Sequence, residues 1–450
     1  MQLGWIVASF GLVFKCGEIV LGYNKSMRFK PKQYSLGKLR VVLVPEERES
    51  VTIRAMVGTG SREETDKEAG SAHFLEHFVF KGTKKFPGMY DINEAVESVG
   101  GAFNAYTGQN EMGFWVKMDK SHVALATQIV GQMVTEPILP PEHFDKERGT
   151  IIEELNMYED RPNSKAAEEC EKLLFGKTNM GRPIVGTVES LKAMTVVNLR
   201  KYFEKWFTGD NIIVGVVGDY GTDKEILALI EKEFAPLLKD KRVLPEKDKF
   251  AWNDQDRPRV KLVSRKVEQA AVCLAFRGIT MTDERRFALE LLNIIYGDGM
   301  MSRLMKEVRE ERGWAYAIGS GADAFTDVGM LMVGAGLPKG KLGEAMKLIE
   351  EISFGLAGAN KWAIKEEELA TAKDCFKGRF ALDFDKPEEV LGLALEDTLF
   401  RDRIYTPEEM LEAIEAVSLK DVLSLAEEIF KRENLSAAIV ADYEKLNFEL

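Results

Sequence analysis

The feature that most constrains the fold of this 450-residue chain is that its second half repeats the order of segments in its first half. In the first half, the apolar segments LRVVLV (39–44) and VTIRAMVGTGS (51–61) precede a helical pattern at 68–80. In the second half, PRVKLV (258–263) and QAAVCLAFRGI (269–279) precede a helical pattern at 283–296. Repetition of this kind predicts a duplicated structural unit of roughly 200 residues.

Each repeat combines strand patterns with helix patterns. Alternating apolar residues predict strands from residue 38 to 61, at 102–107, at 113–118 and at 211–219. Helical periodicity is present at 71–80, 92–99, 121–136, 141–158, 163–174 and 224–238. In the second half, late helices at 364–383 and a strand at 433–442 match 141–158 and 211–219. We therefore expect an α+β fold with two homologous domains, each an antiparallel sheet packed against helices.

A charged, proline-containing stretch without apolar periodicity separates the two repeats and predicts a linker. The expected division is an N-terminal extension at 1–33, a first domain at 34–238, a linker at 239–259 and a second domain at 260–450. The extension contains an apolar run, 4–14, that is shorter than the ~20 residues of a membrane-spanning helix. It also lacks the flanks of a secretory signal, although export or anchoring through residues 1–26 stays an alternative.

The charge balance argues against two classes of partner. The chain has 61 Lys and Arg against 73 Asp and Glu, a net charge of −12, so we expect neither nucleic acid nor a membrane as a partner. The four cysteines are too few and too scattered for a disulfide framework, which favours a reducing, cytoplasmic location. They also form no CxxC pair that would indicate a cysteine zinc site.

One motif carries the chemistry. Only four histidines occur, and two of them form H73-F-L-E-H77 with Glu76 between them. On a helix, positions i, i+3 and i+4 share a face, so both imidazoles and the carboxylate point the same way. Apolar flanking residues predict that this helix is buried, where such polar groups are costly unless they are paired or bound to metal.

This spacing suits zinc. A catalytic zinc requires a third protein ligand and an open position for water, and the order HxxEH is that of the inverzincins. Glu76 can then act as general base on the zinc-bound water. On the predicted helix at 141–158, Glu147 and Glu154 lie seven residues apart on one face, and periodicity alone does not choose between them as third ligand.

These residues resemble the insulinase/pitrilysin family of zinc peptidases, in its branch of about 450 residues with mitochondrial processing peptidases and bacterial relatives. The resemblance extends over nearly the whole chain from about residue 34, and the 76 residues between His77 and Glu154 match the family spacing. It implies one Zn²⁺ per chain held by His73, His77 and Glu154. It also implies Glu76 as general base and Glu147 as the residue that supports a zinc ligand.

The resemblance implies further roles outside the motif. The segment G100-G-A-F-N-A-Y-T107 is similar to the edge strand that pairs with extended peptide substrates, with Asn104 and Ala105 at its centre. Arg309 and Tyr316 resemble the family's Arg/Tyr pair, which binds the substrate and the oxyanion. In relatives of this length, two chains close into a clamshell, so we expect each chain to form half of one.

The expected function is a zinc metalloendopeptidase that hydrolyses unfolded peptides in an enclosed chamber. Because this sequence keeps both motifs, a homodimer is expected, in which Arg309 and Tyr316 serve the partner's site; a heterodimer is the alternative. There are two alternative hypotheses for the function. The protein could be a non-catalytic structural subunit, or it could be a metal-binding chaperone or peptide-binding module without turnover. The intact set of His73, Glu76, His77 and Glu154 argues against the first of these.

Overall fold

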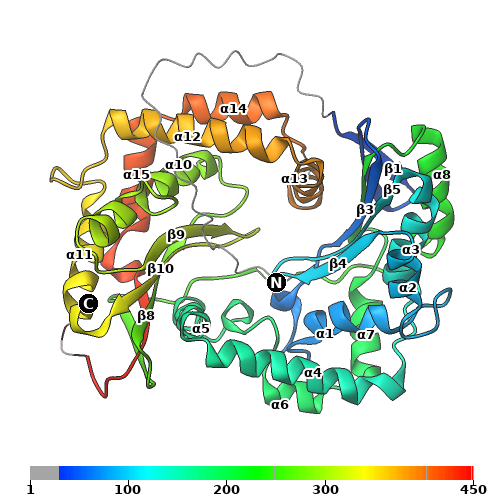
Figure 1. The fold of residues 1–450 in the computed structure, drawn as a ribbon, viewed down its shortest axis with the longest axis horizontal. Coiled ribbons are helices and arrows are strands. Elements are labelled where there is room, and N and C mark those ends of the chain that lie inside the picture. The colour runs from blue at the N-terminus through cyan, green and yellow to red at the C-terminus, as the bar shows by residue number, and fades with distance from the viewer. Residues whose placement is uncertain (1–29, 248, 402, 447, 449–450) are drawn as a thin grey trace.

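The computed structural model describes residues 30–450 except 248, 402, 447 and 449–450. Two sheets form within these residues, and helices of each half cover the outer face of its sheet (Figure 1). The chain is thus an α+β protein of two domains, as the sequence predicts. The apolar run at 4–14 lies outside the described residues. Among the residues that are described, no helix has the length and apolar character needed to cross a membrane.

The first sheet has the strand order β1–β2–β6–β3–β5–β4. Its strands are β1 (Lys32–Leu36), β2 (Leu39–Pro45), β3 (Ser50–Val57), β4 (Ala102–Thr107), β5 (Met112–Asp119) and β6 (Ile212–Gly218). Neighbouring strands are antiparallel except β2 and β6, which are parallel. Strand β4 lies at one edge of this sheet and pairs only with β5 among the described strands.

The second sheet repeats this topology. Its order is β7–β11–β8–β10–β9, and β7 and β11 are its parallel pair. Its strands are β7 (Arg259–Ser264), β8 (Gln269–Gly278), β9 (Ala317–Ala324), β10 (Gly329–Pro338) and β11 (Ser436–Ala441). Strands β7 to β11 therefore occupy the places of β2 to β6, and the predicted duplication extends to strand order and direction.

Helices fill the connections between strands. Those of the first half are α1 (Ser71–Phe78), α2 (Asp91–Glu97), α3 (Val123–Thr135), α4 (Pro141–Asp160), α5 (Pro162–Phe175), α6 (Val188–Ala193), α7 (Val196–Trp206), α8 (Asp223–Glu233) and α9 (Ala235–Leu238). Those of the second half are α10 (Arg286–Tyr296), α11 (Leu342–Gly355), α12 (Glu366–Phe384), α13 (Pro387–Phe400), α14 (Pro407–Ala416) and α15 (Leu419–Ile429). The short helical turns are η1 (Ser61–Glu63), η2 (Val79–Lys81), η3 (Lys120–His122), η4 (Asn179–Gly181), the π-helical η5 (Met305–Glu310), η6 (Lys339–Lys341) and η7 (Arg432–Asn434).

Each half contributes one helix to the inner face of the other half's sheet. Helix α5 packs on β8 and β11, where Cys170 and Leu174 join a core with residues of the second sheet. Helix α13 packs on β2 and β6, where Leu391 and Leu395 join a core with residues of the first sheet. A Cβ atom on Gly215 of β6 would lie 2.7 Å from Leu391 Cδ1, so α13 packs closely on the sheet there and a larger residue would have to displace this side chain.

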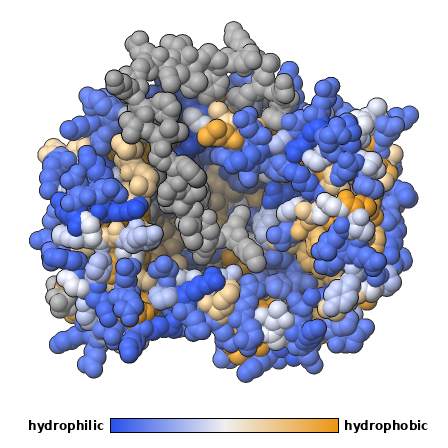
Figure 2. Space-filling model, in the orientation of Figure 1, coloured by the Kyte–Doolittle hydropathy of each residue, from blue (hydrophilic) through white to orange (hydrophobic). Residues whose placement is uncertain are grey.

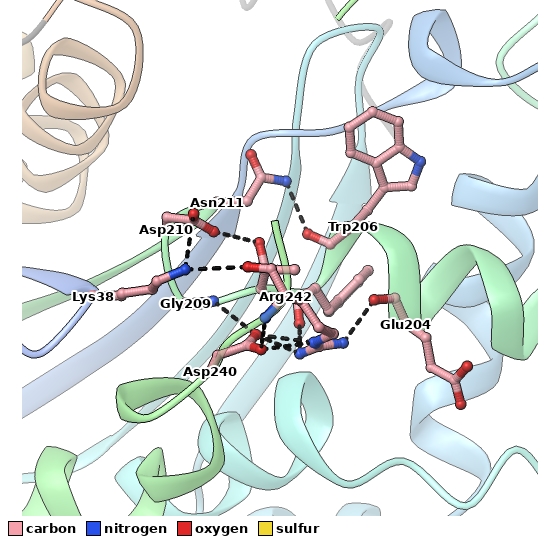
Figure 3. Close-up of polar contacts among 10 residues, drawn as sticks. Lys38, Glu204, Trp206, Gly209, Asp210, Asn211, Asp240 and Arg242 are labelled. Atoms are coloured by element: carbon pink, nitrogen blue, oxygen red, sulfur yellow. Dashed lines mark hydrogen bonds and ion pairs between the residues drawn. The ribbon is translucent and has the colours of Figure 1, made fainter. Parts of the chain in front are cut away.

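The first residues of the predicted linker are attached to the first half of the chain. Arg242 donates hydrogen bonds of 2.7 Å to the backbone carbonyls of Glu204 and Phe207, at the end of α7. Its guanidinium also pairs with the buried carboxylate of Asp240 at 2.7 Å (Figure 3). The chain that follows α9 is thereby held against the turn that leads into β6.

Polar contacts of Arg62 join the two halves. The buried Arg62 guanidinium of η1 pairs with Asp327 in the β9–β10 turn at 2.7 Å and donates to Asn110 Oδ1 at 3.0 Å. Asp327 also accepts a 2.6 Å hydrogen bond from the backbone N–H of Phe250 in the linker. Figure 2 shows a mostly hydrophilic face with a hollow near its centre, between the two halves.

Candidate metal centre

The N-terminus of helix α1, which carries the HxxEH motif, is held in place by the backbone conformation and hydrogen bonds of the residues around it. Its N-cap, Gly70, has a φ of +88°, and a Cβ atom there would lie 2.5 Å from the carbonyl oxygen of Val185. The buried Glu64 carboxylate accepts hydrogen bonds from the N–H groups of Gly70 (2.8 Å) and Ala72 (2.7 Å). These contacts satisfy backbone donors that a helix N-terminus otherwise leaves free. The apolar face of α1 then packs into the main core of the first domain through Ala72, Phe74, Leu75 and Phe78.

Helix α4 crosses the polar face of α1 and brings its carboxylates to the two histidines. His77 Nε2 lies 3.4 Å from Glu154 Oε2, and His73 Nε2 lies 3.7 Å from the same oxygen. One ligand atom from each of these three residues lies within 4.8 Å of the others. Glu147, two turns earlier on α4, has its Oε1 at 3.0 Å from His77 Nδ1.

These distances fit a zinc ion. Tetrahedral zinc with bonds of about 2.0–2.1 Å separates its ligand atoms by about 3.3 Å, close to both distances from Glu154 Oε2. The contact between His77 Nδ1 and Glu147 directs Nε2 of that ring toward Glu154 and His73. On His73, Nδ1 is buried and has no hydrogen-bond partner among the described residues. The donor set of two imidazoles and one carboxylate is that of catalytic zinc sites.

The electrostatics of the two imidazoles differ. Burial, together with the neighbouring His77, lowers the pKa of His73 to about 4. Burial also opposes charging of His77, but its hydrogen bonds to Glu147 and Glu154 outweigh burial and raise its pKa to about 9. The hydrogen bond from His77 lowers the pKa of Glu154. The cluster thus favours positive charge at its centre, and a divalent cation would replace the His77 proton there.

Glu76 lies on the same helix but outside this cluster. It borders a pocket together with His77 and Asn104, and the pocket wall includes the aromatic rings of Phe80 and Phe103. Burial raises the pKa of the Glu76 carboxyl above its ordinary value. A carboxylate with a raised pKa beside a pocket is suited to accept and donate a proton.

Of the predicted substrate-binding residues, Asn104 and Ala105 lie on β4 at the open edge of the first sheet. Asn104 lines the same pocket as Glu76, while Ala105 is buried. Arg309 and Tyr316 lie in the second domain, with the Arg309 guanidinium 5.8 Å from the Tyr316 ring centroid. Tyr316 is 80% exposed, and neither residue contacts the His–His–Glu cluster within the described part of this single chain.

Two residues of the site were not predicted. Lys81 Nζ lies 2.9 Å from Glu147 Oε2, and the Tyr158 hydroxyl donates to Glu154 Oε1 at 3.3 Å. Each lies four residues after a candidate site residue, His77 or Glu154, so the helical i, i+4 spacing was the available signal.

Comparison with known proteins gives a consistent result. The family model described as insulinase (peptidase family M16) matches residues 40–188, and the model described as peptidase M16 inactive domain matches residues 193–374. An uncharacterized zinc protease of Streptomyces coelicolor is 32% identical over 402 residues, which is 88% of this chain and 86% of that protein. An uncharacterized zinc protease of Bacillus subtilis is 30% identical over 391 residues, which is 87% of this chain and 93% of that protein.

The fold is shared with solved structures. A protease from Helicobacter pylori has a TM-score of 0.84 at 22% identity and covers 92% of this chain and 99% of its own. A peptidase M16 inactive domain from Pseudomonas fluorescens has the same TM-score at 18% identity, over 92% of this chain and 98% of its own. The relatives, together with the donor set, support the class of metallopeptidase for this protein. Within that class, the chain belongs to the insulinase family, peptidase family M16.

Proposed function

We propose that this protein is a zinc-dependent metalloendopeptidase that hydrolyses unfolded peptides or oligopeptides in an enclosed chamber. The observation that carries the proposal is the convergence of His73, His77 and Glu154, with Glu76 on the wall of the pocket that His77 also lines. The names of the relatives, zinc proteases, support the choice of metal and of reaction class.

In the proposed mechanism, the residues of the site divide into zinc ligands, a residue that orients a ligand, and a general base. His73, His77 and Glu154 would hold the zinc ion, and Glu147 would fix the orientation of the His77 ring. Bound zinc supplies a Lewis acid that polarises the peptide carbonyl and lowers the pKa of water. Glu76 accepts the proton of the attacking water and delivers it to the leaving amine.

Substrate binding would use backbone hydrogen bonds. Strand β4, which contains Asn104 and Ala105, lies at the open edge of the first sheet, where an extended peptide would add as a further strand with little dependence on sequence. The Ala105 N–H donates to Asn104 Oδ1 at 2.9 Å, so a peptide that binds there would replace this contact. Arg309 and Tyr316 would bind the substrate and the developing oxyanion. We propose that they do so across a homodimer, in the partner's site; a heterodimer is the alternative.

The test is Glu76→Gln. This variant keeps the three proposed ligands, so it should retain zinc, measured by metal analysis of the purified protein. It should lose cleavage of a quenched peptide by at least about 10²-fold, the loss expected for a general base. A metal chelator should likewise abolish cleavage by the wild-type protein. Wild-type cleavage rates in Glu76→Gln, after contaminating proteases are excluded, would contradict the proposal.

A further inference from the structure

The polar faces of α1 and α4 form two stripes that run in opposite directions. On α1 and the following turn η2, the stripe has His73, His77 and Lys81 at four-residue intervals. On α4, the facing stripe contains Glu147 and Glu154. Glu154 lies opposite His73 and His77, and Glu147 lies opposite His77 and Lys81. The stripe of donors therefore continues one step beyond the proposed zinc ligands and ends in a fixed positive charge.

Glu147 has a defined partner on each carboxylate oxygen. Its Oε1 contacts His77 Nδ1 at 3.0 Å, and its Oε2 contacts Lys81 Nζ at 2.9 Å. The Glu147 side chain is 8% exposed, so few water molecules are available to replace a lost partner. A carboxylate held at both oxygens keeps one rotamer, and that rotamer sets the plane of the His77 ring.

We infer that Lys81 is a positioning residue of the metal centre, which acts through Glu147 to hold His77 in the orientation that presents Nε2 to zinc. This inference rests on the proposed function, because it assigns Lys81 to the zinc site. Lys81 also borders the pocket beside Glu76, so direct binding of peptide is the competing role. The two roles differ in which equilibrium the residue changes, zinc binding or peptide binding.

The experiment measures zinc affinity of the full-length metal-free protein by competition with a chromophoric zinc chelator. Lys81→Met should weaken zinc binding about tenfold, the lower end of the range for residues that orient a metal ligand. Lys81→Arg keeps the positive charge and should restore most of the affinity. In a Glu147→Gln background, Lys81→Met should add little further loss, because the residue through which it acts is already altered.

The matched control is Lys84→Met. Lys84 lies three residues further on, and its ion pair with Glu136 is at the surface, so its removal should leave zinc affinity unchanged. If Lys81→Met does not fold, Lys81→Gln removes the same charge with a polar side chain. Wild-type zinc affinity in Lys81→Met or Lys81→Gln would overturn the inference. A raised KM for peptide in the same variant would then favour the role in substrate binding. A wild-type protein that binds no zinc would instead overturn the proposed function itself.

Discussion

At the scale of single residues, two adjacent glutamates of α4 differ in what they can reach. Glu154 lies against both histidines, whereas Glu153 is solvent-exposed. Glu154→Ala should therefore weaken zinc binding by at least about 10-fold, because the variant lacks the proposed third ligand. Glu153→Ala should change zinc affinity by less than about twofold. Equilibrium dialysis with zinc compares the two variants, and a similar loss in both would refute the assignment of the third ligand.

A second residue-scale prediction concerns Glu111, in the turn between β4 and β5. Burial, together with the nearby charge of Glu396, raises the pKa of its carboxyl to about 7. Between pH 5 and pH 7 this carboxyl is largely ionised in the unfolded chain but keeps its proton in the folded chain. The free energy of unfolding therefore falls as the pH rises. Glu111→Gln removes this loss. From pH 5 to pH 8, the variant should gain about 2 kcal/mol in free energy of unfolding relative to wild type.

Urea denaturation at the two pH values measures this difference. The gain should level off above pH 7, once the folded protein has also released the proton. A constant difference between variant and wild type across this range would show that Glu111 ionises alike in both states.

Much of the candidate site could be proposed from the sequence because helical spacing is local. Three residues of one turn, His73, Glu76 and His77, were assigned to one face, and the structure has them on α1. Periodicity did not separate Glu147 from Glu154, because residues seven apart share a face and only the crossing of α1 and α4 decides which of them each histidine meets. Lys81 was missed because it follows the end of α1, in the separate turn η2.

At the scale of elements, the start of α1 depends on a glycine. Gly70 has a left-handed backbone conformation that costs other residues about 1–2 kcal/mol, and an added Cβ would collide with Val185 O. Gly70→Ala should lower the free energy of unfolding by about 2 kcal/mol or more and also weaken zinc binding, because the helix that carries both histidines must shift. Urea denaturation and zinc titration of the same preparation measure the two effects.

The control for this prediction lies on α4. Gly149 is exposed within the helix, and a Cβ atom there would have open space around it. Gly149→Ala should therefore raise the free energy of unfolding by about 0.5–1 kcal/mol. If both alanine variants were equally stable, the argument from the Gly70 backbone would be wrong.

Among the elements that were not predicted, β1 and α13 have sequences that explain why they were missed. Strand β1, KQYSL, has few apolar residues because it lies at an edge of the first sheet. Helix α13, PEEVLGLALEDTLF, has apolar residues around much of its circumference because it packs on the first sheet and on α12. Such a helix lacks the one-sided pattern on which the sequence analysis relied. The parallel pairs were also unforeseen, since a strand's own residues do not record the direction of its neighbour.

At the scale of the whole molecule, α13 ties the second half to the first. Leu395 is fully buried against β6, so Leu395→Ala should lower the free energy of unfolding by about 2–5 kcal/mol. Leu382→Ala on α12 is the control, because that side chain is 67% exposed and its truncation should cost less than about 0.5 kcal/mol. Urea denaturation followed by tryptophan fluorescence compares them, and equal losses would mean that α13 contributes no stabilising interface.

The exchange of α5 and α13 has a consequence for any attempt to divide the protein. A fragment that ends in the linker keeps α5 but leaves behind the surface that α5 covers, and it exposes Val42, Ile213 and Val217 where α13 belongs. The complementary fragment has the reverse deficit. Each fragment therefore exposes apolar surface that the other fragment covers in the intact protein. We expect soluble protein when both fragments are co-expressed and reassemble, and not when either fragment is expressed alone.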